Sequence, residues 1–94
     1  MGSDRPGGDV MAASDHVCAI CRQQRAAHTH ERLPRSRGGP IDEFNCVAIC
    51  ADCHHRVHHH PKWAVEHGWT IPGQMIRGKY RGPDPVYRIY YGGV

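Results

Sequence analysis

The sequence is poor in the residues that build a large hydrophobic core. Only one of its 94 residues is Phe, and the mean hydropathy is −0.62. A chain of this length forms one domain and buries a modest fraction of its surface, so another source of stability is expected. The five cysteines and nine histidines provide one, because bound metal can stabilise a domain that lacks a large core.

Long apolar runs are also missing. No stretch approaches the roughly 18 apolar residues of a membrane span, and residues 1–11 lack the charged-then-apolar pattern of a secretory signal. These absences predict a soluble, cytoplasmic protein with no membrane partner. In a reducing cytoplasm, cysteines at short spacing are expected to bind metal rather than to form disulfides. The net charge of +3 is weak support for a polyanionic partner.

Composition divides the chain into three segments. Residues 1–15 contain Gly, Pro, Ser and Asp without an apolar period and are predicted to form a disordered leader. Residues 16–70 contain the Cys and His motifs. Residues 71–94 alternate basic residues with tyrosines and are predicted to form an irregular arm or one edge strand over 86–91. Such alternation suits contact with nucleic acid, and a solvated tail that packs a few tyrosines explains it equally well.

The middle segment is predicted to hold a few short elements. The pattern predicts a strand within 26–33, a loop over 34–40 and a helix over 51–59. A second helix is expected over 61–67, because a proline opens it and Gly68 follows it. Two tryptophans are expected to pack onto the metal-tied core, namely Trp63 and Trp69.

Two Cys-x2-Cys motifs are the strongest chemical signal. Cys18 and Cys21 form the first motif, and Cys50 and Cys53 form the second. Two such turns can present four thiolates in the tetrahedral arrangement that structural zinc prefers. A site closed by four thiolates offers no position to water, so this zinc is expected to organise the fold rather than to catalyse. Cys46 has no partner at ligand spacing and is interpreted as a small buried apolar residue.

A second group of polar residues lies between and just after these motifs. His54 and His58 are four residues apart on the predicted helix, so they share one face and can chelate a metal ion. His30, Glu31 and Asn45 precede them in the chain. The remaining histidines are interpreted as unligated surface residues, namely His28, His55, His59, His60 and His67.

This order of residues, with HERLPRSRGG at 30–39 and CADCHHRVH at 50–58, resembles the HNH endonuclease family. The resemblance covers roughly residues 18–68. It implies an α+β fold, a small zinc-stabilised ββα-metal domain (HNH or His-Me finger) with a short C-terminal helix and an irregular tail. It also implies a metal-dependent endonuclease that hydrolyses DNA phosphodiester bonds.

The resemblance further implies a role for each residue of the second group. His30, His54 and His58 would bind the catalytic ion, and Asn45 would hold the loop that carries the catalytic dipeptide. The ion would stabilise the charge that develops on the phosphate and on the leaving oxygen. Three imidazoles suit Zn²⁺, Ni²⁺ or Mn²⁺, whereas phosphate oxygens favour Mg²⁺ or Mn²⁺, so the choice of ion stays open.

The sequence departs from the family pattern at the general base. The dipeptide is usually His-His or Asp-His with the second His as base, whereas this chain has His30-Glu31, a variant that resembles small proteins of actinobacterial phages. Glu31 can accept a proton, but a carboxylate is a weaker base than an imidazole, so lower or differently tuned activity is expected. Arg35 and Arg37 adjoin this dipeptide and are expected to bind DNA phosphates, with plain solvent exposure as the alternative.

Other functions fit the sequence less well. A non-catalytic zinc module that binds DNA or a protein, having lost its base at position 31, is the main alternative, but three retained histidines and Asn45 argue against it. A metalloprotease is set aside, because His30-Glu31 is followed by Pro34 and not by the second His of a helical H-E-x-x-H motif. Many small stand-alone HNH proteins belong to bacteriophages and act beside the terminase, so the resemblance suggests terminase subunits as partners and the host cytoplasm as location.

Overall fold

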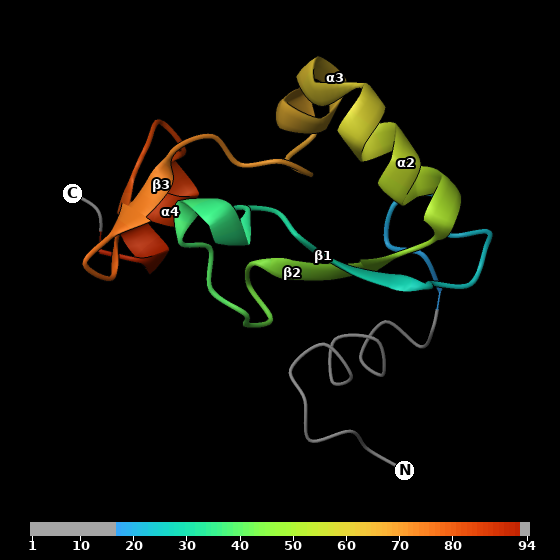
Figure 1. The fold of residues 1–94 in the computed structure, drawn as a ribbon, viewed down its shortest axis with the longest axis horizontal. Coiled ribbons are helices and arrows are strands. Elements are labelled where there is room, and N and C mark those ends of the chain that lie inside the picture. Colours follow the sequence, from blue (N-terminus) through green and yellow to red (C-terminus); the bar gives the residue numbers. More distant parts are fainter. Residues whose placement is uncertain (1–16, 93–94) are drawn as a thin grey trace, which may run out of the picture.

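The structure, a computed structural model, describes residues 17–92. The predicted leader over 1–15 lies outside the described residues. The described chain is an α+β protein with two antiparallel two-stranded sheets and three α-helices (Figure 1). None of the helices in this part is long and apolar enough to cross a membrane.

The first sheet pairs the strand that carries the His-Glu dipeptide with the strand before the second cysteine motif. β1 spans His28–Glu31 and β2 spans Cys46–Ile49, with His30 opposite Val47. β1 thus lies within the predicted strand at 26–33. The predicted loop between the strands contains one short 3-10 helix, η1, at Arg35–Arg37.

Two helices follow β2, as predicted. α2 spans Ala51–His59. Cys50 caps its N-terminus, because the Sγ of Cys50 accepts a hydrogen bond from the backbone N–H of Cys53. α3 spans Pro61–Glu66, opens on its proline and is followed by Gly68 in the left-handed region at φ 77°.

The two tryptophans do not pack as predicted. Within residues 17–92, neither belongs to the apolar cluster around the four cysteines of the two motifs. Trp63 lies instead under the guanidinium of Arg56, 3.9 Å from its ring centroid, and this contact joins α2 to α3. Both tryptophans are half-buried.

The C-terminal segment is ordered, and the expectation of an irregular arm or an edge strand over 86–91 is wrong. β3 (Gln74–Ile76) and β4 (Lys79–Arg81) form a hairpin, and α4 spans Pro85–Tyr90. The carboxylate of Asp84 caps α4 by accepting a hydrogen bond from the N–H of Tyr87, with proline in the first turn. These two start signals outweigh the β-branched and aromatic residues that favour a strand.

The core of the described residues consists of three separate clusters, the smallest of which is formed by Ala26, Cys46 and Ala48 at the first sheet. Ile49 is buried with the cysteines at one end. At the other end, Leu33, Ile71, Tyr80 and Tyr87 form a second buried cluster. Because this cluster joins the loop after β1 to the hairpin and α4, the C-terminal segment packs against the rest of the chain and supports the end of β1.

Candidate metal centres

The cysteines of the two Cys-x2-Cys motifs converge on one point. The Sγ atoms of Cys18, Cys21, Cys50 and Cys53 all lie within 4.8 Å of one another. The backbone N–H of Cys21 points at Sγ of Cys18 at 3.5 Å, and that of Cys53 points at Sγ of Cys50 at 3.4 Å. None of the chain's cysteines is in a disulfide. The cluster suits a structural metal ion such as zinc.

Burial and backbone N–H donors shift the pKa values of these thiols in opposite directions. Burial, followed by contacts with the other thiols, raises the pKa of Cys53, and burial also raises that of Cys50. At Cys18 burial acts in the same direction, but backbone N–H donors outweigh it and lower the pKa to about 6. A divalent cation between the sulfurs would offset the repulsion and keep all four deprotonated.

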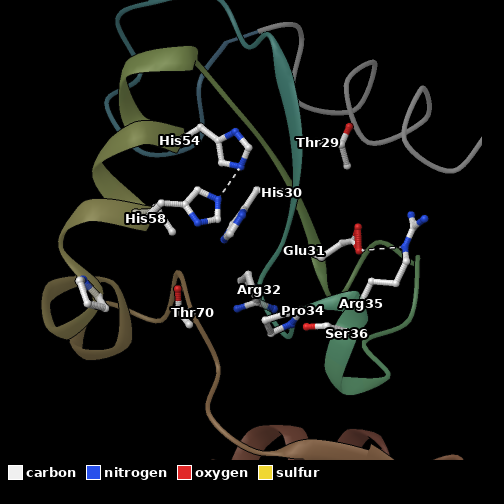
Figure 2. Close-up of a pocket in the computed structure, with 12 residues that line it drawn as sticks. Thr29, His30, Glu31, Arg32, Pro34, Arg35, Ser36, His54, His58 and Thr70 are labelled. Atoms are coloured by element: carbon white, nitrogen blue, oxygen red, sulfur yellow. Dashed lines mark hydrogen bonds and ion pairs between the residues drawn. The ribbon is translucent and has the colours of Figure 1, made fainter.

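Three histidines form a second cluster. His30 on β1 meets His54 and His58 on α2, with ligand nitrogens all within 4.8 Å of one another (Figure 2). The Nε2 atoms of His54 and His58 are 3.1 Å apart. His30 is buried, His54 is half-buried and His58 is exposed. The cluster is therefore anchored on the strand and open on the helix side.

A cleft of about 440 Å³ opens over the histidine cluster. Its walls come from β1, η1, α2 and the segment after α3. The lining residues are Thr29, His30, Glu31, Arg32, Pro34, Arg35, Ser36, His54, Val57, His58, Pro61 and Thr70. Unlike the cysteine site, this site can admit a substrate and water beside a bound ion.

The carbonyl of Trp69 orients the ring of His30. His30 Nε2 lies 2.7 Å from this oxygen, and because a carbonyl can only accept, Nε2 must carry the proton. Nδ1 is then the nitrogen with a free lone pair. A carbonyl on the far ring nitrogen is a common support for metal-bound histidine, since it fixes both tautomer and ring orientation.

The environment favours neutral imidazoles. Burial lowers the pKa of His30, although the Trp69 carbonyl acts in the opposite direction. Burial also lowers the pKa of His54, followed by the nearby rings of His58, His30 and His28. Because metal binds only the neutral imidazole, these shifts favour metal binding by His30 and His54 at neutral pH.

Glu31 lies outside the histidine cluster. Successive residues of a strand face opposite sides, so His30 points to α2 while Glu31 points toward Arg35 (Figure 2). Nε of Arg35 is 3.4 Å from Oε2 of Glu31. That oxygen is buried without a hydrogen bond among the described residues. Glu31 nevertheless lines the same cleft, which suits a group that acts on substrate more than a metal ligand.

The two arginines expected to bind phosphate lie on η1. Arg35 lines the cleft and its side chain is 70% exposed, so it can contact a substrate while paired with Glu31. Arg37 is also exposed, but it is not among the residues that line the cleft. The structure therefore places Arg35, and not Arg37, among the residues that line the cleft.

Asn45 is fully buried and ties the loop after β1 in place. Its Nδ2 donates to the carbonyls of Leu33 at 3.0 Å and Pro40 at 2.8 Å. Its Oδ1 accepts from the N–H of Leu33 at 2.8 Å and from the hydroxyl of Tyr87 at 2.7 Å. The loop turns sharply where it is tied, since a Cβ on Gly39 would lie 1.8 Å from the Leu33 carbonyl oxygen.

Two residues that shape the site had no signal in the sequence. Arg32 lines the cleft, donates to the carbonyl of Phe44 and lies 5.3 Å from the ring centroids of Phe44 and Tyr87. The carbonyl of Trp69 acts through the backbone, so its residue type carries no information. The histidines interpreted as unligated surface residues are all exposed, and among them the ring of His28 is close to that of His54, at 4.9 Å.

Comparison of the chain with protein-family models, with curated proteins and with solved structures gave no match.

Proposed function

We propose that this chain is an HNH-type endonuclease that hydrolyses DNA phosphodiester bonds with one catalytic metal ion. The observation that carries the proposal is the open cluster of His30, His54 and His58, placed on a strand and a helix beside a closed four-cysteine cluster. A closed site can only stabilise, whereas an open site can admit substrate. The order of elements, two antiparallel strands and then a helix, also suits the ββα-metal fold.

The three imidazoles fit a catalytic ion. Burial favours the neutral form of His30 and His54, and the ring of His30 is fixed in the tautomer that leaves Nδ1 available. A divalent ion bound there, Mg²⁺, Mn²⁺, Ni²⁺ or Zn²⁺, would supply charge stabilisation to the phosphate and to the leaving oxygen. His54 and His58 present their nitrogens from consecutive turns of α2, and Asn45 holds the loop after β1 through Leu33.

Glu31 is the base in this proposal. Glu31 lines the cleft and is outside the ligand cluster, so we assign its carboxylate the role of taking a proton from water that attacks the phosphate. Arg35 holds the carboxylate and offers its free donors to a phosphate oxygen.

One observation favours a second candidate, a zinc module that binds DNA or protein without cleaving. Glu31 points away from the histidines and toward Arg35, as it would if its position had become structural (Figure 2). Against this, a binding module does not require three converging imidazoles in an open cleft. The resemblance alone supports a bacteriophage setting with terminase subunits as partners.

Cleavage of supercoiled plasmid by the zinc-loaded protein separates the two candidates. The nuclease proposal predicts nicking or linearisation when Mg²⁺, Mn²⁺, Ni²⁺ or Zn²⁺ is added. Glu31→Gln should lower the rate on the order of 10²-fold or more, because the amide keeps the shape but cannot accept the proton. Glu43→Gln, an exposed glutamate outside the cleft, is the matched control and should cleave like the parent.

Two outcomes would change the assignment. A parent protein that binds plasmid but cuts it with none of these ions supports the binding module. If the protein cleaves but Glu31→Gln is as fast as the parent, Glu31 is not the base, and His28 becomes the next residue to test because of its contact with His54.

A further inference from the structure

The β3–β4 hairpin places an arginine where the backbone disfavours it. Arg77 and Gly78 alone connect Ile76 to Lys79, and their φ angles are +52° and +78°. Two-residue hairpin loops with both φ angles positive favour Asn-Gly or Gly-Gly, because an ordinary side chain is disfavoured in this region. An unfavourable residue at an exposed tip is a reason to look for a function.

The hairpin presents its cations on one side and its aromatic residue on the other. Met75 pairs with Tyr80, which is fully buried in the core cluster with Leu33. The flanking pairs, Gln74 with Arg81 and Ile76 with Lys79, point to the opposite face and are exposed. The outward face therefore carries two cations, an amide and the half-exposed Ile76, with Arg77 at the tip.

These cations are not neutralised by the protein. Residues 74–81 contain Arg77, Lys79 and Arg81 and no acidic residue. Within residues 17–92, none of these three side chains has an ion-pair or hydrogen-bond partner, and the ion pair found there joins Arg35 to Glu31. Three unpaired cations on one short ribbon form a surface complementary to a polyanion.

The hairpin lies at the end of the molecule opposite the start of α2, which follows the second cysteine motif, and η1 lies on the side of the hairpin that faces α2 (Figure 1). Gly38, at the end of η1, packs against Met75, since a Cβ on this glycine would lie 3.0 Å from the Met75 Cβ. The long axis of the chain measures 36 Å. A duplex rises about 3.4 Å per base pair, so the protein can span about ten base pairs.

We propose that the β3–β4 hairpin is a second contact with duplex DNA, one that binds the backbone and groove beside the phosphate held in the cleft. This inference rests on the proposed function in that DNA is the substrate. A two-stranded ribbon fits the major groove. Single-stranded nucleic acid is bound by exposed aromatic rings, and here the hairpin's one aromatic residue, Tyr80, is turned into the core.

Arg77→Asn tests the proposal because it removes the charge and suits the turn better than arginine does. If Arg77 contacts one phosphate, the slope of log K against log salt should fall by about 0.9, which is about eight-fold in affinity at 0.1 M salt. Removing all three cations (Arg77→Asn, Lys79→Gln, Arg81→Gln) should lower the slope by about 2.7. Thermal melting should show that Arg77→Asn is no less stable than the parent.

Arg22→Asn is the matched control. Arg22 is exposed, has φ +57°, and lies beside the first cysteine motif at the opposite end, so its replacement changes net charge and backbone strain in the same way. Fluorescence anisotropy with the zinc-loaded protein and a duplex of about twenty base pairs, twice the expected span, measures binding without a second metal added. The proposal predicts a much larger loss for Arg77→Asn than for Arg22→Asn.

The outcomes separate this inference from the nuclease proposal. Equal losses for Arg77→Asn and Arg22→Asn, or equal binding of single-stranded and duplex DNA, would overturn the hairpin assignment. Cleavage that persists while hairpin variants bind like the parent overturns it as well and leaves the nuclease proposal standing. If duplex binding depends on the hairpin but no ion supports cleavage, the hairpin assignment stands and the nuclease proposal is wrong.

Discussion

Tyr87→Phe and Asn45→Ala test how the C-terminal helix supports the strand that carries His30. The hydroxyl of Tyr87 donates to Oδ1 of Asn45 at 2.7 Å, across 42 positions of sequence. Both side chains are buried, and burial raises the pKa of the Tyr87 hydroxyl to about 12, so it remains a donor at all ordinary pH values. The same Oδ1 accepts from the N–H of Leu33.

The two substitutions differ in what they leave behind. Tyr87→Phe removes one hydrogen bond, but Oδ1 of Asn45 keeps Leu33 as a donor, so the free energy of unfolding should fall by about 1 kcal/mol. Asn45→Ala leaves Leu33, Pro40 and Tyr87 with polar groups that have lost a buried partner. Four such groups are left, namely the N–H and the carbonyl of Leu33, the carbonyl of Pro40 and the hydroxyl of Tyr87. Each costs about 1–3 kcal/mol, so the total loss should be at least about 4 kcal/mol.

Urea unfolding of the zinc-loaded protein, followed by circular dichroism, measures both changes. Tyr90→Phe is the matched control, because Tyr90 stacks on Phe44 but is 57% exposed and its hydroxyl has no hydrogen bond among the described residues. In the double variant of Tyr87 and Asn45, the tyrosine change should cost less than it does alone. Equal effects of Tyr87→Phe and Tyr90→Phe, or full additivity, would refute this account of the network.

Two further predictions concern the metal sites. Cys50→Ser should lose zinc and cooperative unfolding, because it removes one thiolate of the cysteine cluster. The control Cys46→Ser changes a buried cysteine outside the cluster and should keep its zinc. A Cys50→Ser protein with one tightly bound zinc and a sharp melt would contradict the four-cysteine assignment. Burial lowers the pKa of His54 in the folded protein below its unfolded value of about 6.5. Above pH 6.5 the ring is neutral in both states, and the stability is complete. As pH falls toward the lower folded value, the unfolded state binds a proton first, so the free energy of unfolding decreases. As pH falls below about 6.5, His54→Gln should therefore lose less unfolding free energy than the parent, and urea unfolding that shows equal losses in both proteins would count against this effect of burial on His54.

Local signals explain which parts of the fold were predictable. The bounds of α2 follow from a helix start next to a cysteine motif and from the proline at position 61. The convergence of His54 with His58 follows from helical spacing, and that of the two cysteine motifs follows from zinc chemistry. In each case the determining residues are close in sequence or are suited to bind the same metal ion.

The features that escaped prediction depend on contacts between distant residues. Composition predicts an irregular arm or one edge strand over 86–91, because Val86, Tyr87 and Ile89 are strand-forming types, whereas the Asp84-Pro85 pair starts a helix there. The support that Tyr87 gives to Asn45 and the carbonyl that Trp69 presents to His30 join segments about forty residues apart, and periodicity carries no information about either.

Metal titration and plasmid cleavage on the same preparations of His58→Ala and His55→Ala test the central claim most directly. Both residues lie on α2, but His58 points into the histidine cluster while His55 is exposed and stacks on His59. The proposal predicts that calorimetry with Mn²⁺ or Ni²⁺ shows loss of the cleft-bound ion in His58→Ala, together with loss of cleavage, while zinc at the cysteines and the melting curve are retained. His55→Ala should keep the cleft-bound ion and cleave like the parent. Cleavage by His58→Ala at the parent rate, or equal losses in both variants, would contradict a catalytic metal at His30, His54 and His58.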